Sequence, residues 1–190
     1  LLTRGRRAEG HAQEAGEVVF KGNVIRKGTT PLEVQHLGIS MIHQELILLN
    51  ELTVAQNIFL CREPRHKLGL IDFGRMNEEA AQLLNKLGEK IDPRRQVRDL
   101  KIAQKQMVEI AKAISFNVEL LVMDEPTSVL TGKETKILFD LISSLSQQGI
   151  AVVFISHRLK EITDACHKVT VLRDGNFVAT REVSEVTARD

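Results

Sequence analysis

An aliphatic run that ends abruptly in two carboxylates constrains this chain more than any other feature. Residues 119–123 are mostly apolar, and Asp124, Glu125 and Pro126 follow directly. An apolar run without polar alternation is typical of a strand buried on both faces of a parallel sheet. Because α/β proteins bind ligands at the carboxyl ends of such strands, we expect Asp124 and Glu125 to lie at a binding site. One carboxylate can hold Mg²⁺ while the other orients or deprotonates a water; the alternative is a strand that merely ends in an acidic turn.

The composition predicts a soluble globular protein with an ordinary core. The chain has 190 residues, 43% of them hydrophobic and 27% charged, enough for one domain or one domain with a small subdomain. Its 26 basic and 25 acidic residues give a net charge of +1, too neutral to indicate a nucleic-acid or anionic-membrane partner. No apolar stretch approaches the roughly 20 residues that cross a bilayer. The two cysteines lack metal-ligand spacing and suit a reducing compartment.

The first part of the chain divides into a tail and the start of a folded domain. Residues 1–16 have little to bury, which predicts a disordered tail before a domain over 17–190. Apolar residues at 18–20 and 24–25 flank a turn and predict a strand pair. Thr30, Pro31 and Glu33 have the capping-box pattern of a helix start, and 38–42 predicts another strand.

A helical segment separates this start from the rest. Residues 46–116 show helical periodicity, with one helix capped by Asn77 and another over 107–114, and predict an inserted helical subdomain. The core then continues over 117–190. It comprises strand 119–123, a helix capped by Thr131 with Glu134, strand 151–155, a short helix from Ser156, and a hairpin over 169–179. Alternating strands and helices predict a parallel sheet and an α/β fold.

Four features follow one another in a meaningful order. Gln44 comes just after a strand, residues 100–106 open a helix, Asp124 and Glu125 end a strand, and His157 follows the next strand. With these features, residues 16–185 closely resemble the ATP-binding subunits of ABC transporters. Together, the phrases IHQEL (42–46), QMVEIAKA (106–113) and MDEPTS (123–128) are specific for this family. The first of them resembles the corresponding phrase in the branch that imports ribose, xylose, arabinose or galactose.

The resemblance implies a P-loop NTPase-like ABC ATPase core and a role for each matched residue. Gln44 matches the Q-loop glutamine, which reaches Mg²⁺ and the attacking water. Asp124 matches the aspartate that holds Mg²⁺, Glu125 the catalytic glutamate, and His157 the histidine that contacts the γ-phosphate. Two further segments match loops that meet a paired ATPase domain, namely the nucleotide-contacting signature residues Lys101, Ile102, Ala103 and Gln104 and the loop that begins at Ser128.

The resemblance also implies cofactors, partners and a location. The cofactors are ATP and Mg²⁺. The partners are a second ABC ATPase domain, in the same polypeptide or in a homodimer, a membrane permease that receives the helical insert, and indirectly a sugar-binding protein. No nucleic acid is expected. The implied location is the cytoplasmic face of the cell membrane, as a peripheral subunit.

The chain departs from the family in two segments. The family binds phosphate with a loop G-x-x-x-x-G-K-[ST] after its first strand, and no such match occurs in these 190 residues, so we expect a core that lacks this strand and loop. Where the family has Leu-Ser-x-Gly, this chain has Leu100, Lys101, Ile102 and Ala103. Lys101 removes a hydroxyl but adds a cation. Ala103 adds a methyl where the backbone must come close, so we expect the signature contact to be weaker by about 1–3 kcal/mol.

Two other functions remain open. A truncated or degenerate ABC domain would fold and pair but would not bind or hydrolyse ATP by itself. A soluble ABC ATPase of DNA repair or translation is the third possibility, and the neutral charge and the sugar-importer phrases speak against it.

Overall fold

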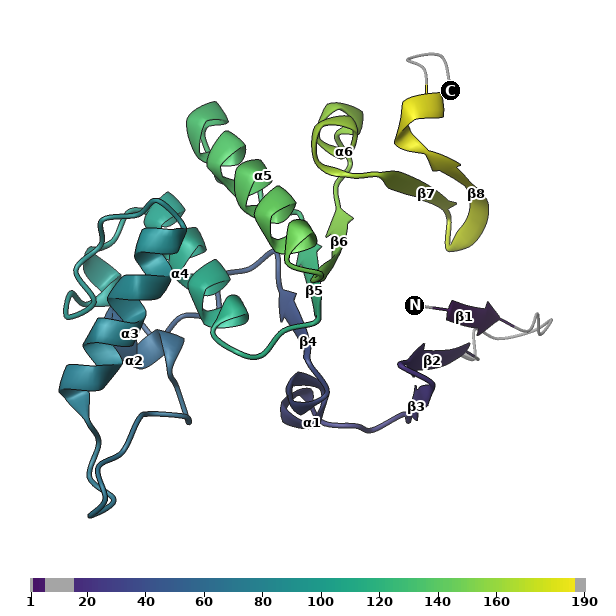
Figure 1. Cartoon of the computed structure of the whole chain (residues 1–190). Coiled ribbons are helices and arrows are strands. Elements are labelled where there is room, and N and C mark those ends of the chain that lie inside the picture. Colours follow the sequence, from purple (N-terminus) through teal and green to yellow (C-terminus); the bar gives the residue numbers. More distant parts are fainter. Residues whose placement is uncertain (1, 6–15, 187–190) are drawn as a thin grey trace.

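The structure, a computed structural model, describes residues 2–5 and 16–186 (Figure 1). Three short sheets and six α-helices make up this part of the chain. Their order is β1 (Leu2–Gly5), β2 (Gly16–Phe20), β3 (Asn23–Ile25), α1 (Pro31–His36), β4 (Ile39–Ile42), α2 (Val54–Ile58), α3 (Phe73–Lys86), α4 (Ile102–Ile114), β5 (Leu120–Asp124), α5 (Gly132–Gln147), β6 (Ala151–Ile155), α6 (Leu159–Ala165), β7 (Lys168–Arg173) and β8 (Asn176–Glu182).

The central sheet consists of three parallel strands in the order β4–β5–β6. The middle strand, β5, is the aliphatic run of the sequence, and its Leu121 and Met123 are fully buried. Ile42 pairs with Met123, and Asp124 pairs with Ile155, so the three strands end at nearly the same level. The predicted α/β fold with a parallel sheet is confirmed.

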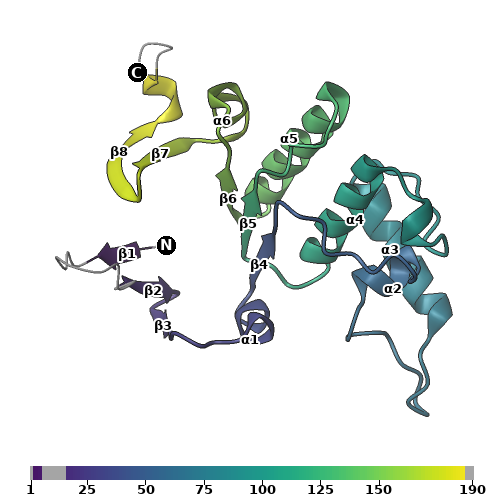
Figure 2. The same cartoon turned by 180° about the vertical axis from the view of Figure 1, so that it is seen from behind.

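A helical subdomain separates β4 from β5 along the chain. Figures 1 and 2 show α2, α3 and α4 packed together on one side of the central sheet, with α6 and the β7–β8 hairpin on the other. The helix predicted to begin after Asn77 starts five residues earlier. Asp72 is its cap and accepts a 2.9 Å hydrogen bond from the backbone N–H of Arg75. The earlier start buries Met76 on the same face as Ala80 and Leu84, an apolar stripe one turn longer than the predicted one.

Two capping boxes predicted from the sequence are present. Thr30 and Glu33 cap α1, and Thr131 and Glu134 cap α5 through hydrogen bonds in both directions. The buried residues of α5 are Leu138, Ile142 and Leu145. The short helix predicted from Ser156 begins instead at Leu159, and the backbone N–H of its cap residue Arg158 donates a 3.0 Å hydrogen bond to Ser156 Oγ.

The first residues of the chain differ from the predicted tail. Leu2–Gly5 forms β1 and pairs antiparallel with β2, which supplies partners for the backbone groups of an otherwise unpaired strand edge. Of the predicted tail, residue 1 and residues 6–15 lie outside the described residues. The predicted strand pair is β2 and β3, and the predicted hairpin is β7 and β8, with a tight turn at Asp174 and Gly175 that both adopt positive φ.

One hydrophobic core joins the sheet and the helical subdomain. The cluster runs from Ile42, Leu121 and Leu138 beside the sheet to Leu84 and Met107 between the helices. None of the helices in the described ranges is long and apolar enough to cross a membrane. The shared core fixes the helical subdomain against the central sheet.

Candidate active site

Glu125 lies directly after β5 with its backbone in a left-handed conformation. Its φ is +44°, which non-glycine residues seldom adopt and which costs about 1–3 kcal/mol. The backbone N–H of Glu125 donates a 3.0 Å hydrogen bond to the carbonyl of Ile155, at the end of β6. This bond holds the chain as it turns out of the sheet. It presents the Glu125 side chain, 27% exposed, at the carboxyl edge of the strands.

His157 approaches the same carboxylate from the next strand. Its Nδ1 lies 2.9 Å from Oε1 of Glu125, within hydrogen-bond distance, and the two form an ion pair when the imidazole is protonated. The His157 ring is 67% exposed and therefore open to a ligand. Two residues that are 32 positions apart meet because β5 and β6 are parallel neighbours.

Gln44 reaches the other oxygen of Glu125. Its Nε2 lies 3.5 Å from Oε2, at the long limit of a hydrogen bond, and the residue follows β4. The structure therefore brings together three of the predicted site residues: Gln44, Glu125 and His157. They come from the ends of all three parallel strands.

Side chains of the helical subdomain hold the loop that carries Gln44. The carboxylate of Glu109, on α4, accepts a 2.9 Å hydrogen bond from the backbone N–H of Ile47. Asn57, on α2, is fully buried and bonds both the N–H and the carbonyl of Leu49. Burial raises the pKa of Glu109, although the Lys112 cation and the bond from Ile47 act against the rise. The position of Gln44 thus depends on α2 and α4.

Asp124 is the last residue of β5 and is partly buried. Within the described ranges, no group of three or more His, Cys, Asp or Glu side chains is arranged to hold a metal ion. The oxygens of Asp124 and Gln44 are hard donors at one sheet edge, and hard donors suit Mg²⁺, which normally keeps several waters and uses few protein ligands. The residues present therefore fit this ion.

Glu161 is a buried residue that no sequence pattern predicted to belong near the site. Its carboxylate accepts hydrogen bonds from Thr127 Oγ1 at 2.8 Å, Ser156 Oγ at 2.6 Å and Arg158 Nη1 at 3.0 Å. Burial disfavours the Glu161 carboxylate, but these hydrogen bonds outweigh burial and lower its pKa. The sequence near Glu161 gives no signal that two separate loops converge on it, because Thr127 is 34 positions away along the chain.

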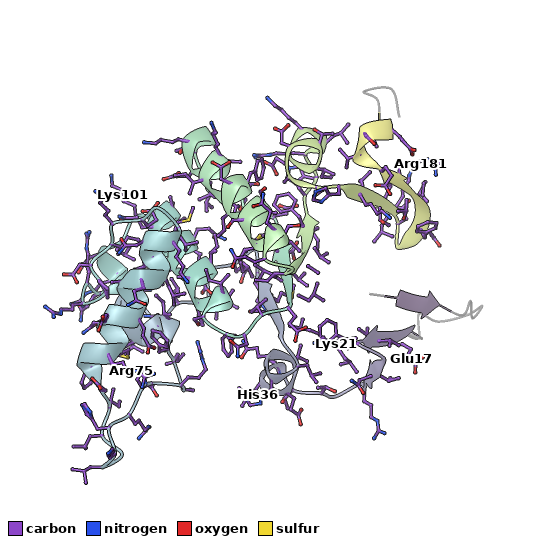
Figure 3. All side chains as sticks on the ribbon, in the orientation of Figure 1. Glu17, Lys21, His36, Arg75, Lys101 and Arg181 are labelled. Carbon is purple, nitrogen blue, oxygen red and sulfur yellow. The ribbon has the colours of Figure 1, made fainter. Side chains whose placement is uncertain are left out.

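The remaining predicted site residues lie elsewhere. Lys101 precedes α4, and its backbone N–H donates to the side chain of Gln104, also in the predicted signature segment. Figure 3 shows Lys101 on the side of the molecule that the helical subdomain forms. Ile102 is 56% exposed, and Ser128 is also exposed. In residues 16–186, no hydrogen bond joins the side chains of the predicted signature segment to those of Glu125 or His157. A separate cavity of about 310 Å³ lies beside this segment, lined by Leu46, Leu48, Asn50, Leu100, Ile102 and Lys105.

The chain matches the model of one known protein family. The ABC transporter family model matches residues 8–128, more than half of the chain. The chain belongs to the ABC transporter family. The predicted family is therefore confirmed.

Two curated relatives have sugar-import names. The ribose import ATP-binding protein RbsA of Chelativorans sp. (strain BNC1) is 47% identical over 93% of this chain and 34% of its own length. The RbsA protein of Geobacillus kaustophilus (strain HTA426) is 45% identical over 92% of this chain and 35% of its own length. This ABC chain thus spans about a third of the length of these relatives.

Solved structures agree on the fold. A dimeric post-hydrolysis state of an ATP-binding cassette, bound to ADP and Pi, aligns with a TM-score of 0.75 at 20% identity, over 89% of this chain and 74% of that one. The ADP conformation of another ATP-binding cassette aligns with a TM-score of 0.73 at 25% identity, over 89% and 70%.

Proposed function

We propose that this chain is part of an ATP-hydrolysing subunit that energises sugar import by an ABC transporter. The observation that carries the proposal is the 2.9 Å contact between Glu125 and His157 at the end of β5. Family membership and the names of the two relatives, which are ribose import ATP-binding proteins, support the same function.

The residues divide the chemistry between them. Glu125 accepts a proton from water as the water oxygen bonds to the γ-phosphorus and the bond to the ADP oxygen breaks, which leaves ADP and phosphate. His157 hydrogen-bonds a γ-phosphate oxygen, and Gln44 orients the water. Asp124 and Gln44 would hold Mg²⁺, which offsets the negative charge of the phosphates when it is bound.

Several partners belong to the proposal. The exposed Lys101–Gln104 segment and Ser128 would meet the nucleotide of a second ABC ATPase domain, in the same polypeptide or in a homodimer. Exposed apolar residues in and near the helical subdomain, such as Ile47 and Leu49, suit contact with a membrane permease. This permease would receive sugar from a binding protein and would hold the subunit at the cytoplasmic face of the membrane.

The test uses a polypeptide in which a strand and a G-x-x-x-x-G-K-[ST] loop precede this chain. We expect Mg²⁺-dependent ATP hydrolysis that Glu125→Gln lowers by at least about 100-fold, because a positioned general base contributes roughly that much. Glu182→Gln, on the hairpin, removes the same charge and should keep the wild-type rate. Hydrolysis that is insensitive to Glu125→Gln would refute the assignment.

A second measurement concerns the alternative of a degenerate domain, which the altered signature residues Lys101 and Ala103 favour. Mg²⁺–ATP is titrated into the 190-residue chain as it stands, without the added loop, and followed by calorimetry. Binding in the micromolar range contradicts the degenerate domain, and absence of binding supports it.

A further inference from the structure

Glu161 is the one ionisable side chain that is buried among residues 17–186, with 8% of its surface exposed. A buried carboxylate is unfavourable unless hydrogen bonds compensate it. All the compensating donors come from two loops. Thr127 belongs to the loop after β5, and Ser156 and Arg158 belong to the loop after β6.

These donors lie next to the two residues that meet at the sheet edge. Thr127, itself 3% exposed, is two residues after Glu125. Ser156 and Arg158 are the immediate neighbours of His157, and Ser156 Oγ also accepts a 3.0 Å hydrogen bond from the backbone N–H of Arg158. The residues on both sides of His157 are thus bonded to Glu161 through their side chains.

We infer that Glu161 is a positioning residue for the Glu125–His157 pair, an inference that deepens the proposed function. One of its oxygens accepts from both Thr127 and Ser156, so a single atom joins the two loops. The other oxygen accepts from Arg158 and orients the carboxylate. Glu125 has a left-handed backbone conformation that it would leave if its loop were released, and the bond to Thr127 restrains that loop. Glu161 itself does not contact the reacting atoms.

The inference is tested without nucleotide, by the imidazole ¹⁵N signals of His157 in the full 190-residue chain. His157→Gln identifies these signals among the six histidines. Glu125→Ala supplies the reference shift for a lost contact. We expect Glu161→Ala to move the His157 signals at least halfway to this reference, and Glu161→Gln, which keeps an acceptor oxygen, to move them less.

Glu134→Ala is the matched control. The Glu134 carboxylate also accepts two short hydrogen bonds at a loop, from the N–H and the hydroxyl of Thr131, but it caps α5 and does not join the two loops. This variant should lower the midpoint of thermal unfolding and leave the His157 signals in place. If Glu161→Ala does the same, Glu161 is only a stabilising residue and the inference is wrong.

Milder variants cover the case in which Glu161→Ala does not fold. Thr127→Val and Ser156→Ala each remove one donor at little change in volume, and each should shift the His157 signals in the same direction. Unchanged signals in both folded variants overturn the inference.

Hydrolysis by the polypeptide with the glycine loop gives the functional readout. Glu161→Ala should lower kcat by about 10- to 100-fold, as expected for a misplaced catalytic group, and change the KM for ATP less than about 2-fold. Failure of the proposed function would appear as hydrolysis insensitive to Glu125→Gln, with the His157 shifts still present. Failure of the inference would appear as unchanged His157 signals while Glu125→Gln still stops hydrolysis.

Discussion

At the scale of single residues, the site depends on carboxylates whose surroundings differ. Glu125 lies at an open edge beside His157, Glu161 is buried and accepts hydrogen bonds from two loops, and Glu109 is half-buried against the loop that carries Gln44. The protein lowers the pKa of Glu161 and raises that of Glu109. The sequence reveals which residues are acidic, but their surroundings come from residues far away along the chain.

The raised pKa of Glu109 leads to a prediction about how the stability of the protein changes with pH. Because its folded pKa is raised above 4.5, its stabilising contribution is complete below that pH and is lost as pH rises through the folded pKa. In the Glu109→Gln variant, the new side chain would keep an oxygen for the N–H of Ile47 and carry no charge. We therefore expect the free energy of unfolding of this variant, minus that of the wild type, to increase as pH rises from 4.5 to about 7.5. Urea denaturation measures both free energies.

The control for that experiment is Glu78→Gln, which removes one negative charge from the exposed face of α3. If both variants change equally with pH, the effect comes from overall charge, and the local explanation fails.

At the scale of elements, the same capping box serves two helices with different amounts of buried surface. Thr30 and Thr131 each accept from the N–H three residues on, and Glu33 and Glu134 bond back. However, α1 buries no residue, whereas α5 buries Leu138, Ile142 and Leu145. The sequence pattern predicts the start of both helices, and packing decides what each start contributes to stability.

We expect Thr131→Ala to lower the free energy of unfolding by about 1 kcal/mol, the usual loss for an N-cap hydroxyl. Thr30→Ala removes the same group from α1. Because α1 adds little to the core, this variant should lower the free energy of unfolding by less than half as much. Chemical denaturation followed by circular dichroism measures both. Equal losses would contradict this explanation.

At the scale of the whole molecule, the helical subdomain and the central sheet share one core. The sequence predicts a helical segment at 46–116, and the structure joins its Leu84 and Met107 with Leu121 of β5 in a continuous apolar cluster. The cluster also explains how α2 and α4 hold the loop of Gln44 next to the strand of Glu125. A shared core should unfold cooperatively.

Leu84→Ala tests the shared core. Leu84 is fully buried, so the variant should lose about 2–5 kcal/mol of stability, and it should lower hydrogen-exchange protection in β5 as well as in α3. Leu68→Ala, at a side chain that is 89% exposed, should change stability by less than about 0.5 kcal/mol. Loss of protection confined to α2, α3 and α4 would show that the subdomain unfolds by itself.

The order and type of most elements follow from local sequence patterns, and so does the identity of the paired carboxylates Asp124 and Glu125. Apolar runs, capping boxes and turn residues act over a few positions, so their consequences can be predicted locally. The start of α3 differs from the predicted one because Asp72, and not Asn77, caps the helix.

Which side chains meet depends on how the strands pair in three dimensions. Gln44, Glu125 and His157 follow three different strands, and parallel pairing in register brings the strand ends to one edge. The buried Glu161 was not predictable, because its partners Thr127 and Ser156 become neighbours only after β5 and β6 pair. Contacts between loops depend on the sheet that carries them, whereas caps and strand patterns depend on the chain nearby.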